Sequence, residues 1–334
     1  MKNKKSNIYI LIIVTILVLY FSLKDNFFEI INQFSSLNPT WILLAIFLTI
    51  LYWCIKTLSL NNIIKKIKKD QQYSQTLKLT LETQFFNAVT PFASGGQPFQ
   101  VYHLVKKGIS LSSSTNIITQ NFIVYQIALV SIGIIAVISN NIFNLFPDVG
   151  LLKKLVTIGF IINVLIIVFL FLVSFSVKFN KTIVGISIEL LAKSKIIKNK
   201  EKVTEKWNNY INNFKKNASI LIEDKAQFLL NILYNFIALS CLYLVPLFIL
   251  YSTGDYTSFT ALESIVAVAY VMLMGSFVPI PGGTGGLEYG FIAFFGNFIS
   301  GSKLQAIMLM WRFVTYYLGL FIGAIAINIK KKEN

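Results

Sequence analysis

Acidic residues are scarce in this chain. Only 14 of its 334 residues are aspartate or glutamate, against 30 lysines and arginines, and charged residues together make up 13% of the sequence. Hydrophobic residues make up 55%. A chain this apolar is not an ordinary soluble enzyme with a large core, and its composition is typical of a polytopic membrane protein.

Cysteine and histidine are almost absent. The two cysteines, Cys54 and Cys241, lie in apolar stretches and are interpreted as small core residues, so no disulfide framework or zinc site is indicated. The single histidine, His103, has no serine or cysteine partner in a recognisable catalytic setting. Glycine-rich nucleotide-binding motifs are missing as well. We therefore expect no catalytic residue, no metal and no cofactor, and no nucleic acid as a partner.

The positive charge is carried almost entirely by lysines at the ends of apolar segments, and the net charge is +16. Such clusters are typical of cytoplasmic loops, and they also attract anionic lipid headgroups; the two interpretations are compatible. Because both ends of the chain are rich in lysine, we expect a multi-pass protein of the cell membrane with both termini in the cytoplasm. Lys56, near the end of an apolar stretch, is expected to extend its ammonium group to the membrane surface.

Long apolar runs predict the membrane-spanning helices, which need about 20 residues each. Seven runs qualify, at residues 8–23, 41–60, 115–139, 151–177, 228–251, 259–278 and 304–329. An odd number does not return the chain to its starting side, so the short apolar run 287–299 is expected to supply one more crossing. The predicted fold is an all-α polytopic membrane domain over residues 1–334, with seven to eight transmembrane helices and two re-entrant or broken helices.

The first predicted break lies within residues 75–104, which are too polar for an ordinary span. A polar stripe at helical spacing begins it, and the helix then stops at Pro91. Lysine-rich sequence flanks both ends, which favours a re-entrant hairpin over the alternative, an amphipathic hairpin at the membrane surface. The stripe consists of Thr76, Thr80, Thr83 and Asn87.

The second break, residues 279–288, interrupts apolar sequence with two prolines and four glycines and ends on Glu288. Such backbone in lipid must line a cavity or bind something, and a carboxylate at membrane depth indicates a functional site. Both breaks fit the pattern Pro-x-x-(Ser/Thr)-Gly-Gly. Coincidence is one explanation; the other is a pair of related re-entrant elements that meet within the membrane.

In the second explanation, glycine amides and the starts of new helices would form a cradle for a phosphate headgroup. The candidate binding residues are Pro91, Ser94, Gly95, Gly96, Gln97 and Gln100 in the first break, Pro281, Gly282, Gly283, Thr284, Gly285, Gly286 and Glu288 in the second, and Arg312 in the last span.

Arg312 is the only arginine in a chain that otherwise uses lysine, and it lies about eight residues into an apolar helix. Arginine stays charged and binds a carboxylate or phosphate with two parallel hydrogen bonds. Its natural partner in the membrane is Glu288. Three interpretations remain open: a structural ion pair, a pair that exchanges partners with a lipid phosphate, and an arginine that extends to the surface.

Residues 178–225 form the one long polar segment. Within it Val203, Trp207, Tyr210, Ile211 and Phe214 recur at helical spacing, and lysines occupy much of the rest. This pattern predicts an amphipathic helix at the cytoplasmic surface of the membrane. The alternative is a soluble helix that packs on a neighbouring loop.

With these motifs in hand, the chain resembles the flippase-like integral membrane family, also called the lysylphosphatidylglycerol synthase transmembrane region. The likeness is carried, in order, by residues 90–98, residues 279–290 and the Trp311-Arg312-Phe313 motif. Many members have an acid where Gln97 stands and a basic residue near Gln100, so the resemblance carries no charge-based role over to the first break. Two-domain members add a soluble aminoacyltransferase domain; because this chain ends at Asn334, we expect a stand-alone transmembrane region.

The resemblance implies a lipid translocator for an anionic, aminoacylated or polyprenyl-phosphate lipid, a function linked to antimicrobial peptide resistance. The alternatives are a membrane component of lipid modification, by lysyl or aminoacyl transfer to phosphatidylglycerol, and a scaffold for an envelope biosynthesis enzyme. If the protein were an enzyme, the family implies a phosphatidylglycerol lysyltransferase. Expected partners are a membrane phospholipid or polyprenyl-phosphate lipid, with a second copy of the chain or an envelope enzyme as a further partner.

Overall fold

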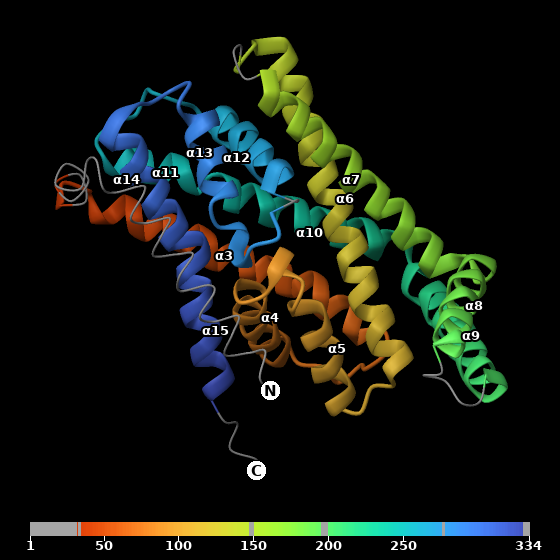
Figure 1. Ribbon diagram of the computed structural model, residues 1–334. Coiled ribbons are helices and arrows are strands. Elements are labelled where there is room, and N and C mark those ends of the chain that lie inside the picture. The colour runs from red at the N-terminus through yellow and green to blue at the C-terminus, as the bar shows by residue number, and fades with distance from the viewer. Residues whose placement is uncertain (1–31, 33–34, 147–149, 195–199, 276–277, 330–334) are drawn as a thin grey trace.

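The computed structural model (Figure 1) describes residues 32, 35–146, 150–194, 200–275 and 278–329. All regular secondary structure in these ranges is helical, which confirms the predicted all-α class. The first predicted span, residues 8–23, and the lysines at 330–332 lie outside the described residues.

Five helical stretches in the described part of the chain are long and apolar enough to cross a membrane. They match five of the seven predicted spans. They are α3 (Pro39–Lys65), α6 (Leu111–Phe143), most of α7 (Gly150–Phe175), the pair α10 (Lys225–Tyr243) and α11 (Val245–Ser252), and the last stretch, Gly301–Asn328.

The last stretch is not a regular helix throughout. It begins as α14 (Gly301–Arg312), passes through one π-helical turn, η3 (Phe313–Tyr317), and continues as α15 (Leu318–Asn328). Single π-helical turns inside α-helices often mark functional sites. Here the turn begins directly after Arg312 and alters the register of the aromatic residues that follow it.

The sixth predicted span, residues 259–278, forms the shorter helix α12 (Ala261–Gly275). Its start is fixed by a capping box, because Thr260 and Glu263 exchange hydrogen bonds between side chain and backbone. Fifteen residues rise about 22 Å in an α-helix, which is less than the thickness of a bilayer core, about 30 Å.

The first break is the tip of a helical hairpin, as predicted. Helix α4 (Tyr73–Ala88) leads to a short turn, η1 (Pro91–Ala93), and α5 (Gly96–Lys106) returns beside it. Phe86 of α4 stacks on Phe99 of α5, with ring centroids 4.0 Å apart. The two helices therefore run in opposite directions and hold the tip between them.

The second break is also the tip of a hairpin. The chain leaves α12, turns at η2 (Pro281–Gly283) and returns as α13 (Gly286–Phe295). Gly290 of α13 packs on Met274 of α12, where even a methyl group would lie 2.6 Å from that side chain. Helices α12 and α13 are therefore antiparallel neighbours, and residues 286–295 run back along α12, the direction that an additional crossing would take. That residues 287–299 cross the membrane stays a prediction.

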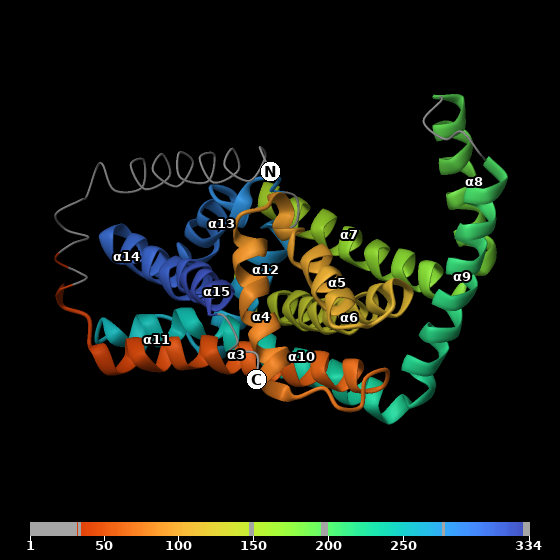
Figure 2. The ribbon, with the colours of Figure 1, turned by 90° about the horizontal axis from the view of Figure 1, so that it is seen from below.

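The long polar segment forms two helices, α8 (Val177–Lys193) and α9 (Lys200–Glu223), which stand together at one side of the molecule (Figure 2). The apolar face of α9 is partly covered by the protein itself. Ile211 and Phe214 are buried, and Asn116 of α6 donates a hydrogen bond to the carbonyl of Phe214. This part of the face therefore packs on another helix, α6, and not on a loop, whereas Trp207 is exposed.

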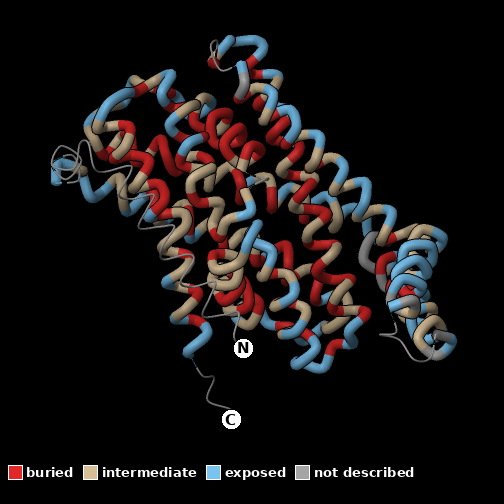
Figure 3. The backbone as a smooth tube through the Cα atoms, in the orientation of Figure 1, coloured by how far each residue is buried: buried red, intermediate tan, exposed pale blue. Residues whose placement is uncertain are grey.

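The core lies where the hairpins meet the last span. Buried residues gather in the middle of the molecule, and α8 and α9 are mostly exposed (Figure 3). Trp311 of α14 stacks on Phe291 of α13, with centroids 4.8 Å apart. Helix α15 packs along α4, and the two hairpin tips, η1 and η2, contact each other. The last span therefore touches both hairpins.

Candidate functional site

The two hairpin tips share one backbone conformation. After the proline, the next two residues are left-handed in both: φ is 54° at Phe92 and 51° at Ala93, and 68° at Gly282 and 63° at Gly283. Left-handed backbone is strained for residues with a side chain. The first tip keeps the left-handed turn despite this strain, and the second tip forms it with two glycines. The same turn at the same two positions supports a relation between the breaks over coincidence.

The hydrogen bonds within the tips agree as well. The hydroxyl group of Ser94 donates to the carbonyl of Pro91 at 2.8 Å, and that of Thr284 donates to the carbonyl of Pro281 at 2.9 Å. Each serine or threonine thus closes its own turn. In both tips the hydroxyl residue of the pattern therefore stabilises its own turn.

The tips diverge after the turn. Gly285 has φ 88°, whereas Gly95 has φ −76°. When the two patterns are aligned on their glycine pairs, Gln97 corresponds to Leu287 and not to Glu288. The amide and the acid that follow the breaks are therefore not equivalent, and only the second tip carries a charged side chain.

Arg312 and Glu288 form a buried ion pair. Nε of Arg312 lies 2.7 Å from Oε1 of Glu288, and their side chains are only 4% and 7% exposed. Nη2 of Arg312 also donates hydrogen bonds to the carbonyl of Gly282 at 3.0 Å and to the hydroxyl of Thr284 at 3.4 Å. The predicted pairing is confirmed, and burial at this level excludes an arginine that extends to the surface.

Glu288 is held at both oxygens. Its other oxygen, Oε2, accepts a hydrogen bond of 2.7 Å from the backbone amide of Gly285, at the start of α13. The predicted phosphate cradle is therefore already filled at this amide by the protein's own carboxylate. At the first tip the amide of Gly95 is likewise engaged, by the hydroxyl of Thr90 at 2.8 Å.

Tyr316 links the last span to both tips. Its hydroxyl group donates a hydrogen bond of 3.1 Å to the carbonyl of Ala88, at the end of α4. The guanidinium carbon of Arg312 lies 4.4 Å from the centre of its ring, a favourable cation–π geometry. The ring also packs so closely on Gly282 that a methyl group there would lie 2.3 Å from it.

A cavity of about 380 Å³ lies beside the two tips, within the size range of ligand sites. Its lining is amphipathic. The polar part is formed by Gln84, Asn87, Gln126, Asn163, Arg312 and Thr315, and the apolar part includes Phe122, Leu129, Leu242, Met272 and Val278. Polar groups inside a membrane protein are costly unless they serve a function or pair with one another.

The predicted site residues fall into three groups. Gly282, Gly283 and Arg312 line this cavity. Gln100 lines a small chamber next to it. The remaining candidates shape the tips and do not line the cavity: Pro91, Ser94, Gly95, Gly96, Gln97, Pro281, Thr284, Gly285, Gly286 and Glu288.

Some lining residues were not among the predicted site residues. The polar stripe on α4 was identified, and its last member, Asn87, reaches the cavity. Tyr316 carried one local signal, because it follows Arg312 by four residues and so shares its helix face. Asn163 had none beyond being polar in an apolar run; it accepts a hydrogen bond of 3.3 Å from Gln126.

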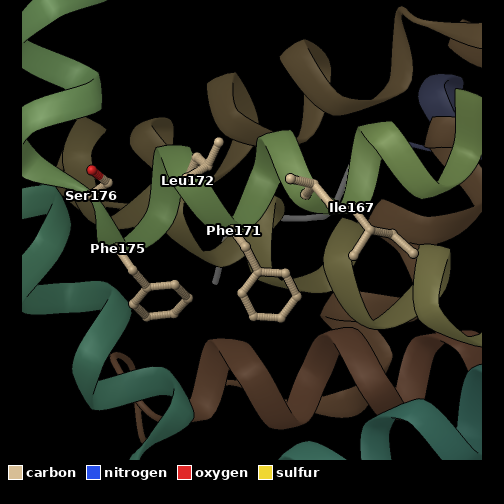
Figure 4. Close-up of a pocket in the computed structure, with 6 residues that line it drawn as sticks. Ile167, Phe171, Leu172, Phe175 and Ser176 are labelled. Carbon is tan, nitrogen blue, oxygen red and sulfur yellow. The ribbon is translucent and has the colours of Figure 1, made fainter.

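A second hollow, of about 640 Å³, lies along α7 and is almost wholly apolar. Figure 4 shows Phe171 and Phe175 on the same side of the helix, pointing away from it. The hollow is lined by Ile167, Val168, Phe171, Leu172, Phe175 and Ser176. Asn163, in the wall of the cavity, precedes Ile167 by one helical turn, so the polar cavity and the apolar hollow follow each other along α7.

These features define a polytopic helical membrane protein in which two hairpins meet at a partly polar cavity. Residues 7–323 match the family described as the lysylphosphatidylglycerol synthase TM region, and the chain belongs to that family. It is also similar to a protein of Archaeoglobus fulgidus described as a UPF0104 membrane protein, with 23% identity over 299 residues that cover 87% of each chain. The resemblance found in the sequence is thereby confirmed.

Proposed function

We propose that the protein moves a lipid with a phosphate-bearing headgroup between the two leaflets of the cell membrane. One observation carries the proposal: the two related hairpin tips meet at a cavity with partly polar walls, among helices that are apolar enough to cross a membrane. Helices broken in corresponding halves of a transporter commonly form its substrate site. An anionic, aminoacylated or polyprenyl-phosphate lipid suits this cavity.

In this proposal the headgroup and the tails occupy different spaces. The headgroup enters the cavity, where Gln84, Asn87 and Gln126 replace the hydrogen bonds that it loses on leaving water. An unpaired polar group in an apolar medium costs several kcal/mol, so such replacement lowers the barrier to crossing. The hydrocarbon tails lie in the apolar hollow along α7 and remain in contact with the bilayer.

The ion pair of Arg312 and Glu288 has a structural role in this mechanism. It fixes the second tip to the last span, and Tyr316 fixes the first tip to the same turn. Movement of a headgroup past the tips would shift this shared turn, so that both hairpins move together. The membrane orientation that we favour places both chain termini in the cytoplasm.

The test uses purified protein in liposomes with fluorescent lipids in one leaflet. A panel of labelled phosphatidylglycerol, lysyl-phosphatidylglycerol, a polyprenyl phosphate and phosphatidylcholine is compared with empty liposomes. We expect faster exchange for at least one of the first three. If every lipid exchanges at the rate seen in empty liposomes, the proposal is wrong.

A lipid-modifying function is the second candidate, because the family is described as the transmembrane region of a lipid synthase. Lipid extracts of cells with and without the protein test it separately. The appearance of an aminoacylated lipid that depends on this chain alone, together with no lipid exchange in liposomes, would favour aminoacyl transfer over translocation.

A further inference from the structure

Lys56 is half-buried, although the sequence predicted that its ammonium group would reach the membrane surface. It lies in the second half of α3, and its side chain is directed at two tyrosines. Nζ donates a hydrogen bond of 3.1 Å to the hydroxyl of Tyr52 and lies 4.5 Å from the ring centre of Tyr125. Tyr125 is itself part of the cavity wall.

Among the residues that the structure describes, no carboxylate lies within 4 Å of this ammonium group. The described ion pairs join Glu82 to Lys78 and His103, Asp255 to Lys303, and Glu288 to Arg312. A buried ammonium group without a counter-charge carries a large desolvation cost. The aromatic ring and the tyrosine hydroxyl offset only part of it, because a cation–π contact contributes about 2 kcal/mol when desolvated.

A small polar chamber lies against Lys56 and adjoins the cavity. Its volume is about 20 Å³, room for about one water molecule. Gln84 and Asn87 line both the chamber and the cavity. Asn121 also lines the chamber; it is 8% exposed, and its side-chain oxygen has no hydrogen-bond partner among the residues that the structure describes. The chamber thus presents an acceptor that suits an ammonium group or water, whereas an anion fits only the larger cavity.

We propose that Lys56 is the cation that binds the phosphate of the transported lipid. This inference rests on the function proposed above. The phosphate lies in the cavity against Gln84, Asn87 and Tyr125, and the flexible lysine side chain swings from the face of Tyr125 to meet it. Arg312 is already neutralised by Glu288, so it holds the tips, and Lys56 supplies the net positive charge. The substrate class is then a lipid with a net negative phosphate headgroup.

The proposal is tested first by a binding measurement, which does not depend on transport. Purified protein in detergent is titrated with dihexanoyl-phosphatidylglycerol, followed by calorimetry, and with dihexanoyl-phosphatidylcholine as the zwitterionic comparison. We expect Lys56→Met to weaken binding of the anionic lipid at least tenfold, Lys56→Arg to stay within a few-fold of wild type, and the zwitterionic lipid to bind weakly to all three. Lys154→Met, which removes an exposed lysine on α7, is the matched control and should bind like wild type.

Unfolding temperatures show whether a loss of lipid binding is caused by a loss of folding. Removal of this half-buried ammonium group leaves no charged partner behind, so Lys56→Met should unfold at the same temperature as wild type or higher when no lipid is added. Added dihexanoyl-phosphatidylglycerol should raise the unfolding temperature of wild type and not that of the variant. If Lys56→Met does not fold, Lys56→Gln takes its place in both measurements.

The failures are distinguishable. Equal binding of the anionic lipid by wild type and Lys56→Met would overturn the role of Lys56, even if wild-type protein moves lipid. Binding of inorganic phosphate as tightly as the lipid would overturn the assignment to a lipid headgroup. Lipid exchange no faster than in empty liposomes, with Lys56-dependent binding intact, would count against translocation and leave the binding site in place.

Discussion

The hydroxyl group of Tyr316 donates a hydrogen bond of 3.1 Å to the backbone carbonyl of Ala88. This contact joins the π-helical turn of the last span to the tip of the first hairpin. The same tyrosine ring packs on Gly282 in the second tip. One side chain is therefore in contact with both tips.

Tyr316→Phe should loosen this link without disturbing the ring. The variant loses one hydrogen bond, which corresponds to about 1 kcal/mol of the free energy of unfolding, and keeps the packing on Gly282 and Arg312. We expect the unfolding temperature to fall only slightly, whereas the lipid exchange rate should change clearly. Tyr289→Phe, at an exposed position, is the control. An exchange rate that stays at the wild-type value would show that the link has no part in movement.

Gly282→Ala should destabilise the fold in two ways, by backbone strain and by steric overlap. The same substitution at a second glycine separates the two. At φ 68° an added side chain is strained, and its methyl group would overlap the ring of Tyr316. Gly254 has φ 80° and open space around it, so Gly254→Ala reports the strain alone, about 1–2 kcal/mol. We expect Gly282→Ala to lower the unfolding temperature clearly more. Equal effects would mean that the contact with Tyr316 is unimportant.

Glu288→Gln should leave Arg312 buried without its counter-charge. Breaking one side of a buried pair costs about 3–5 kcal/mol, so the variant should unfold at a much lower temperature in detergent. The double variant Glu288→Gln/Arg312→Gln removes both charges and should recover part of the loss. If the double variant loses as much stability as the two single variants together, the structural role given to this pair is contradicted.

The surroundings of Asp255, in the loop between α11 and α12, predict that the stability of the fold depends on pH. Burial raises the pKa of its carboxyl group, but hydrogen bonds from Lys303, Ser258 and Thr257 outweigh it and hold the pKa well below its usual value. A carboxyl group with a lowered folded-state pKa stabilises the fold above its unfolded-state value, about 3.9, and this contribution is lost as the pH falls below it.

Asp255→Asn should therefore lower the unfolding temperature at pH 7, and the difference from wild type should shrink as the pH falls below about 4. Thermal unfolding across this pH range measures it. Glu201→Gln, on an exposed part of α9, should show no such convergence. A constant difference between Asp255→Asn and wild type at all pH values would rule out the ionised carboxylate as its source.

The sequence predicted the features that local chemistry determines. Proline and glycine located both tips, because they end helices wherever they occur, and the rarity of arginine singled out Arg312. Its pairing with Glu288 followed because few buried partners exist for a charge in a membrane. The second break predicted a re-entrant element, but the helix on which α13 packs did not follow, because hydropathy sets the length of an apolar run and not its neighbours.

Other site features depend on contacts between distant parts of the chain. The hydrogen bond from Tyr316 to Ala88 spans 228 positions, and no local pattern marks it. Lys56 lies near the end of an apolar run, where lysines usually extend to the surface. Its burial is decided by the tyrosines that surround it, one of them contributed by α6. The cavity is likewise the product of helix packing, so its lining could be identified only in part.

The most direct test of the account fills the cavity and measures lipid movement. Leu129 lines the cavity, and Leu165 is an exposed leucine on the lipid-facing helix α7. In liposomes, Leu129→Trp should slow exchange of the anionic lipid to the rate of empty liposomes, whereas Leu165→Trp should exchange it like wild type. If Leu129→Trp folds and exchanges the lipid as fast as wild type, the headgroup does not pass through this cavity.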